Sequence, residues 1–140
     1  MADLSVTAAS VLQASGAATT QGIAGATITQ GQATYLDTTT NTWKLARANS
    51  ATTAGSGTSL IGISLVSCVS GQPIVVQTSG GINPGATVAI GTQYVLSAAV
   101  AGNIAPIADL TTGNICTLLG IATTASNIAL APNPTTIVHA

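Results

Sequence analysis

The stretch GATITQGQATYLDTTTNTWKLA, from Gly25 to Ala46, contains two short strand candidates and a polar turn between them. The strand candidates are Gln32 to Leu36 and Thr42 to Ala46, which carry Thr, Tyr and Trp side chains that favour extended backbone. The turn, Asp37 to Asn41, consists of Asp, Thr and Asn, whose side chains readily hydrogen-bond to nearby backbone groups. This pattern predicts an antiparallel pair of strands.

The rest of the sequence continues this alternation of short strands and turns. Helix is poorly supported, because Glu is absent, Thr, Ser, Val and Gly dominate, and Ala sits between β-branched neighbours. Turn-forming residues such as Gly80-Gly81 separate the segments. The sequence therefore predicts an all-β fold, a small antiparallel β-barrel or sandwich. The further strand candidates are Leu60 to Val66, Pro73 to Thr78, Ala86 to Ile90, Gln93 to Ser97, Asn103 to Ile107, Cys116 to Ala122 and Asn127 to Leu130.

An internal repeat is visible in this pattern. Gly25-Ala26-Thr27-Ile28 recurs as Gly85-Ala86-Thr87-Val88, and a glycine and a Tyr-containing strand follow each copy. Leu60-Ile61-Gly62-Ile63 recurs as Leu118-Leu119-Gly120-Ile121. Because one such unit could not bury its own apolar face, we expect two similar β units packed with approximate twofold symmetry.

The domain organisation follows from the repeat. The predicted β domain spans residues 25–131, with a duplication that relates 25–79 to 85–131. Residues 1–24 precede the first copy and are expected to form an extended N-terminal arm, while 132–140 form a short C-terminal tail behind two prolines. Two roles remain open for the arm: it adds a strand to the sheet edge of a partner or neighbouring subunit, or it completes the barrel of its own subunit.

Charge is the unusual quantity in this composition. Only 4% of the residues are charged, where an ordinary soluble domain has about 25%. Two basic and three acidic side chains would have to keep the surface of a monomer soluble, roughly 6,500 Å² for a chain of this size. Because Thr, Ser, Asn and Gln do little to keep molecules apart, we expect sister subunits or a larger assembly to cover much of this surface.

Several protein classes conflict with these features. Disordered chains combine low hydrophobicity with high charge, whereas 46% of this chain is hydrophobic. No run of 18 or more apolar residues predicts a membrane span, and the acidic start MADLSV does not resemble a signal peptide. We therefore expect the chain to be made in the cytoplasm and to have no contact with a membrane. Cys68 and Cys116 each sit in an apolar, strand-like run, which favours buried free thiols over a disulfide.

Residues for chemistry are scarce. The single histidine, His139, is the penultimate residue and is expected to be solvated. With one histidine, close to the end of the chain, no credible set of nucleophile, base and acid can be assembled, and three scattered carboxylates do not form a calcium loop or a glycosidase pair. Asp37 and Asp109 are expected to cap local turns, and Asp3 lies in the mobile start. We therefore expect no enzymatic activity, no metal and no cofactor.

Nucleic-acid binding is also disfavoured. Lys44 and Arg47 are the only fixed positive charges, too few to neutralise a phosphate backbone. The aromatic residues are Tyr35, Tyr94 and Trp43, too few for a stacking platform. Both tyrosines are expected in the core or in an interface, and for Trp43 both core packing and a contact role remain open. The candidate residues for an interface with a partner or a sister subunit are Leu4, Val6, Val11, Leu12 and Trp43.

The sequence resembles small bacteriophage head-decoration proteins, also called capsid cement proteins. In that family an apolar-Thr strand is followed by a Gly-Gln pair, a Tyr-Leu-Asp strand end, a polar turn and a Lys-Leu-Ala strand, as in residues 25–46. The strand GQPIVVQTS from Gly71 to Ser79, and Gly91 to Leu96 followed by Ala105-Pro106, continue the likeness. It covers most of residues 25–130, and its motifs are short.

This resemblance implies a compact β-barrel-like subunit that assembles as a homotrimer on the outer surface of an icosahedral virion head. Members of the family bridge neighbouring major capsid subunits and bring no catalytic residues with them. The long arm, residues 1–24, is a departure from the family pattern. The alternative function is a receptor-binding module of a phage fibre or spike, although the shortage of aromatic and acidic side chains argues against a glycan groove.

Overall fold

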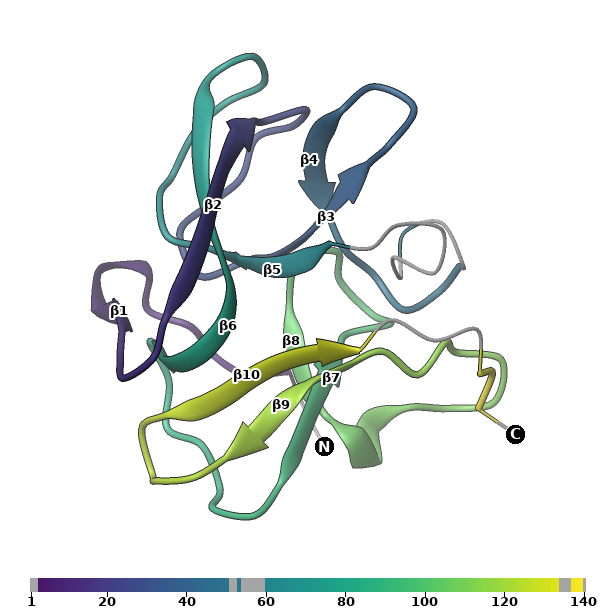
Figure 1. Ribbon diagram of the computed structural model, residues 1–140. Helices are drawn as coiled ribbons and strands as arrows, with labels where there is room; N and C mark the ends of the chain where they lie inside the picture. Colours follow the sequence, from purple (N-terminus) through teal and green to yellow (C-terminus); the bar gives the residue numbers. More distant parts are fainter. Residues whose placement is uncertain (1–2, 51–52, 54–59, 134–136, 140) are drawn as a thin grey trace.

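A computed structural model describes residues 3–50, 53, 60–133 and 137–139. In this part of the chain, ten antiparallel strands form one strongly curled sheet without an α-helix, so the all-β prediction is confirmed (Figure 1). The strands are β1 (Val11–Gln13), β2 (Ala18–Ile23), β3 (Ala33–Asp37), β4 (Thr42–Leu45), β5 (Ile61–Ser64), β6 (Pro73–Pro84), β7 (Gln93–Leu96), β8 (Ile104–Pro106), β9 (Leu118–Ala122) and β10 (Ile128–Asn133). Two short 3₁₀ turns, η1 (Ala8–Ser10) and η2 (Ile107–Asp109), complete the elements.

The strand β6 connects the two halves of the sheet. Its first part pairs with β5, and its second part pairs with β10. The strand bends at Gly80, where φ is +89° and a Cβ atom would collide with the carbonyl of Gly16. The fully buried Gln77 supports the bend, because its Nε2 donates to the carbonyl oxygens of Ser79 at 3.1 Å and Gly81 at 2.8 Å. The expected turn at Gly80-Gly81 is therefore wrong: these glycines bend one continuous strand.

Both halves have the same pairing order. The sheet runs β4-β3-β5-β6 in the first half and β8-β7-β9-β10 in the second. Equivalent hydrogen bonds recur: Gly31 N donates to Ser64 O at 2.8 Å, and Gly91 N donates to Ala122 O at 2.9 Å. Gly31 and Gly91 also share a left-handed backbone, with φ of +93° and +82°. This correspondence is what the duplication inferred from the sequence would produce.

The N-terminal arm is part of the sheet. β1 and β2 run antiparallel to β6 along the edge that β5 and β10 leave open, with a register shift near Ala18. Figure 1 shows this purple segment passing from beside β8 to β1 and on along β6. The arm is extended, as expected, but it is not a separate segment. Two roles were left open for the arm, and the structure shows the second: the arm completes the sheet of its own subunit.

The core consists of two apolar clusters. The larger cluster draws side chains from both halves, including Tyr35, Ile63, Tyr94 and Leu119. The smaller lies inside the first half, where Trp43 packs with Ala24, Ile28, Cys68, Ile74 and Val76. Because the larger cluster is shared, neither half buries its apolar residues alone.

The first half closes on itself at Trp43. Ala24, directly after β2, forms a parallel bridge with Trp43 in β4, and Gly25 N donates to Trp43 O at 2.7 Å. Gly22 makes this close approach possible, because a Cβ atom there would lie 2.6 Å from Trp43 Nε1. Trp43 is 2% exposed, so the structure shows core packing, which was one of the two roles left open for this side chain.

One sequence expectation needs correction at the local level. Ala86 to Ile90 forms no strand, because Gly85 and Gly91 both have positive φ and turn the backbone on either side. In the predicted tail, residues 137–139 pair with residues 113–116, and Val138 forms an isolated bridge with Ile115. Residues 134–136 and 140 of the predicted tail, and 1–2 of the predicted arm, lie outside the described residues.

The contact between Gly22 and Trp43 gives a first prediction. Gly22→Ala should lower the free energy of unfolding by about 1–3 kcal/mol, since the added methyl group overpacks a filled core. Chemical denaturation measures this loss. Trp43 is the only tryptophan, so a red shift of its fluorescence should report its displacement.

The matched control is Gln21→Ala on the same strand, where the side chain is exposed. It should leave both the stability and the fluorescence nearly unchanged. Equal stability of Gly22→Ala and the wild type would contradict the proposed closure at Trp43.

Candidate functional site

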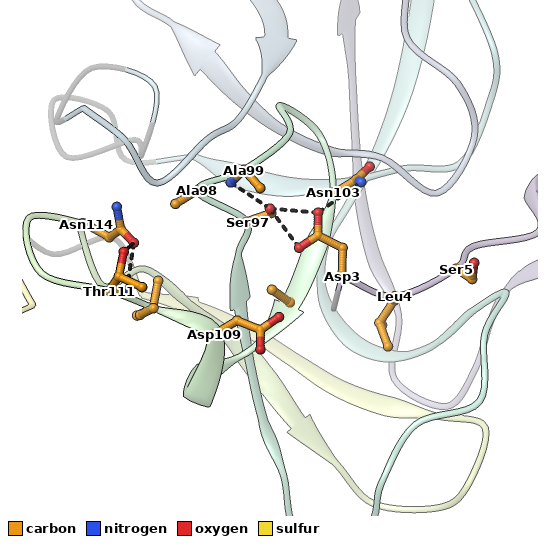
Figure 2. A pocket seen from close by; sticks show the side chains of 12 residues that line it. Asp3, Leu4, Ser5, Ser97, Ala98, Ala99, Asn103, Asp109, Thr111 and Asn114 are labelled. Atoms are coloured by element: carbon orange, nitrogen blue, oxygen red, sulfur yellow. Dashed lines mark hydrogen bonds between the residues drawn. The ribbon is translucent and has the colours of Figure 1, made fainter. Parts of the chain in front are cut away.

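One concave region is a cavity of about 670 Å³ in the second half (Figure 2). One side is formed by residues 3–5, which lie beside the loop that follows β7. The other side comes from η2 and the loop after it, with Asp109, Thr111 and Asn114. The lining mixes apolar residues with hydroxyl, amide and two carboxylate side chains, and none of the lining residues is Lys or Arg.

Asp3 is fixed in this cavity by hydrogen bonds. Ser97 Oγ lies 2.9 Å and 2.8 Å from its two carboxylate oxygens, and Asn103 Nδ2 donates to Oδ2 at 3.1 Å. The backbone is fixed as well, because Leu4 N donates to Ile104 O at 2.8 Å. The expectation of a mobile start at Asp3 is therefore wrong. The carboxylate binds two side chains that lie more than 90 residues away in the sequence.

On the opposite wall, Thr111 and Asn114 stabilise a turn. Asn114 Oδ1 accepts from Thr111 N at 2.8 Å and from Thr111 Oγ1 at 3.0 Å. Asp109 is the last residue of η2 and directly precedes Leu110. The cap that we expect it to make on the turn after it stays a prediction.

Other charged side chains also make structural contacts. Lys44 Nζ lies 2.7 Å from Asp37 Oδ2, an ion pair across the β3–β4 hairpin. Asp37 also accepts from Thr39 N at 2.9 Å, so its expected role in the turn is confirmed. Arg47 donates from Nε to Ala98 O and from Nη2 to Ala99 O, both at 2.9 Å, and thereby joins the two halves.

The ion pair shifts the pKa of both side chains. The hydrogen bond from Lys44, with that from Thr39 N, holds the pKa of Asp37 below its ordinary value. The same contact raises the pKa of Lys44. Burial raises the pKa of the Cys68 thiol, and no disulfide joins Cys68 to the half-buried Cys116.

The residues expected at an interface have different environments. Trp43 and Val11 are each 2% exposed, and both belong to the core of the subunit. Leu4 and Val6 pack partly buried against the larger cluster. Leu12 is the exception, with 62% of its surface exposed. In this fold both side chains therefore pack inside their own subunit, and Leu12 is the member of the set that is largely exposed.

A second concave region was not predicted from the sequence. It is an open groove of about 500 Å³ beside β1, lined by Val11, Leu12, Gln13, Leu65, Val66 and Val75. Its residues come from three separate segments, and only the pairing of β1 with β6 brings them together. The strand-like pattern of Leu65, Val66 and Val75 was visible in the sequence, but the neighbouring arm was not.

Within the described part of the chain, no group of three or more His, Cys, Asp or Glu side chains could hold a metal ion. No helix among residues 3–50, 53, 60–133 and 137–139 is long and apolar enough to span a membrane. Comparisons with known protein families, with curated proteins and with solved structures give no match. The resemblance to head-decoration proteins therefore stays a prediction from the sequence.

The pair of Asp37 and Lys44 gives a pH-dependent prediction. Because the folded pKa of Asp37 lies below an unfolded value of about 3.9, its ionised form contributes stability above that value. That contribution is lost as the pH falls through the folded pKa. We expect Asp37→Asn to be less stable than the wild type at pH 6, with the difference shrinking below about pH 3.9 and disappearing once the pH is below the folded pKa of Asp37.

Urea denaturation at several pH values measures this difference. Lys44→Met should remove the same pH-dependent contribution, and 1 M salt should reduce it, because both groups are near the surface. An Asp37→Asn difference that persists unchanged at pH 2 would show that the carboxylate charge is not its source.

Proposed function

We propose that this chain is a non-enzymatic virion structural protein that decorates and stabilises an icosahedral phage head by bridging major capsid subunits. The observation that carries the proposal is the use of charge within the subunit. Asp3, Asp37, Lys44 and Arg47 all form contacts inside the chain. The exposed surface is left with little charge to keep copies or partners apart.

Exposed apolar side chains support the same proposal. The total accessible surface is 6203 Å², and several large aliphatic residues remain exposed on it. A neutral surface with these side chains suits close packing against other subunits better than free diffusion. The most exposed are Ile90 at 70%, Ile137 at 65%, Leu12 at 62%, Val138 at 53%, Val100 at 52% and Val69 at 50%.

A receptor-binding module of a fibre or spike is the second candidate. The observation in its favour is the polar cavity beside Asp3, since carboxylate, amide and hydroxyl groups can bind sugar hydroxyls. The described lining of this cavity has no aromatic ring on which a sugar could stack. We therefore rank this function below head decoration.

Copy number separates the two proposals. Virions that carry this chain should be purified and its peptides counted against those of the major capsid protein by quantitative mass spectrometry. A lattice protein gives hundreds of copies per particle, so we expect a ratio near one or a simple fraction of the capsid protein. A few to a few dozen copies would overturn head decoration in favour of the fibre or spike.

Salt sensitivity and assembly state provide a further prediction. We expect a trimer at micromolar concentration in native mass spectrometry, because a stable interface would bury more than about 1,000 Å² of the neutral surface. Attachment to particles should withstand 1 M NaCl, which shortens the Debye length to about 3 Å, because few ion pairs can form across the contact. A clean monomer, or release of the chain by moderate salt, would contradict these expectations.

A further inference from the structure

We propose that residues 3–14, here called the N-terminal strand, exchange between copies of this chain. In one subunit this strand fills a seam in the second half, between Gly85 and β8. In an assembly, the strand of one copy occupies the same seam in its neighbour. The inference rests on the repeat and on the way each half closes, and it does not depend on the proposed function.

The two halves close differently. In the first half, the strand ends meet directly, since Gly25 N donates to Trp43 O and Ala24 bridges Trp43. The corresponding positions in the second half are Gly85, which matches Gly25 in the repeat, and Ile104. Trp43 lies opposite Leu36 and Ile104 lies opposite Leu96, so the two residues match in register.

The N-terminal strand is inserted at this second closure. Leu4 N donates to Ile104 O and Thr7 N donates to Gly85 O, both at 2.8 Å. β1 then continues along the second part of β6, with Val11 opposite Pro84 and Gln13 opposite Ile82. The strand therefore has no counterpart in the repeat and occupies a place that the two repeated units leave open.

The contacts that hold this strand can be reproduced by another copy. They are backbone hydrogen bonds, the buried Val11, the partly buried Leu4 and Val6, and the carboxylate of Asp3 on Ser97 and Asn103. An identical strand from a neighbour would make every one of them. Exchange of an identical element therefore costs little beyond the rearrangement of its hinge.

A hinge lies directly after the strand. Gly16 has φ of +75°, and no atom lies within 4 Å of the position that its Cβ would take. Beyond it, β2 is fixed by six paired positions along β6 and by the packing of Gly22 on Trp43. The N-terminal strand can therefore leave the seam while β2 and the first half stay folded.

Concentration decides between the two arrangements. Within one chain the strand reaches its own seam at a high effective concentration. When copies are closely packed, the seams of neighbouring copies compete for the same strand. The weak net charge of -1 puts no long-range repulsion between copies. Exchange should thus rise with protein concentration.

A cysteine cross-linking experiment tests the exchange in the full-length chain. Both native cysteines are replaced by alanine. Leu12→Cys is introduced into one version of the chain and Asn83→Cys into a second version of different size, so that a gel resolves the heterodimer. Leu12 and Asn83 face each other across β1 and β6, where the spacing of paired Cα atoms suits a disulfide. The versions are mixed at high concentration, oxidised and separated on a non-reducing gel.

The matched control is Gln21→Cys with Val75→Cys, which face each other across β2 and β6 beyond the hinge. We expect about tenfold more covalent heterodimer from the first pair than from the control, because only the N-terminal strand exchanges. A second test pair, Ala14→Cys with Gly81→Cys, has Cβ positions 3.0 Å apart and guards against a fault in the first variants.

The same pairs placed in one chain establish that each disulfide can form. If they close within single chains but neither mixed test pair gives heterodimer, the proposal is overturned. It is also overturned if the control pair yields as much heterodimer as the test pairs, since global unfolding or random oxidation would then explain the cross-link.

Discussion

The fold depends on hydrogen bonding along both edges of β6. This strand belongs to both halves, and each buried backbone group along it needs a partner. One edge is shared by β5 and β10, and the other is covered by β1 and β2. Gly80 and the side chain of Gln77 allow the strand to bend without ending. Two similar units are thereby joined by a single strand and by a core to which both contribute.

The way in which the strand edges are covered also bears on function. Exposed edges invite pairing with other chains, and here the long edge of β6 is covered by the chain's own N-terminal segment. Charged side chains, which commonly protect edges and surfaces, are instead engaged in contacts such as Asp37 with Lys44 and Arg47 with the loop after β7. We therefore expect a subunit built this way to need neighbours, more than charge, for its solubility, as the proposed role in a virion shell would provide.

Part of this architecture could be predicted from the sequence. Tyr35 and Tyr94 mark matching strands, and the glycines at 31 and 91 mark matching turns, because side-chain type and positive φ leave a local signature. The pairing of the arm left no such signature. β2 is largely exposed and is held by backbone hydrogen bonds, which any residue except proline can make. The continuity of β6 was missed for a related reason, since Gly80-Gly81 favours a turn unless Gln77 and the arm support a bend.

The site was less predictable than the fold. Val11 and Trp43 are candidates for an interface in the sequence because isolated apolar residues near a terminus or a turn have no evident partner there. Their partners come from distant segments, such as Ile74 and Val76 for Trp43. The cavity beside Asp3 likewise requires residues 3–5 to lie against the loop after β7. Such contacts over long sequence distances follow from topology, which the pattern of strands alone did not specify.

Scanning calorimetry tests most directly whether β6 makes the two halves one cooperative unit. The account predicts a single transition whose calorimetric and van't Hoff enthalpies agree once the oligomeric state is included, at about 100 kcal/mol of chain near 60 °C. Two separate transitions, each with roughly half of this enthalpy, would show that the halves unfold independently. That result would contradict the central role given to β6.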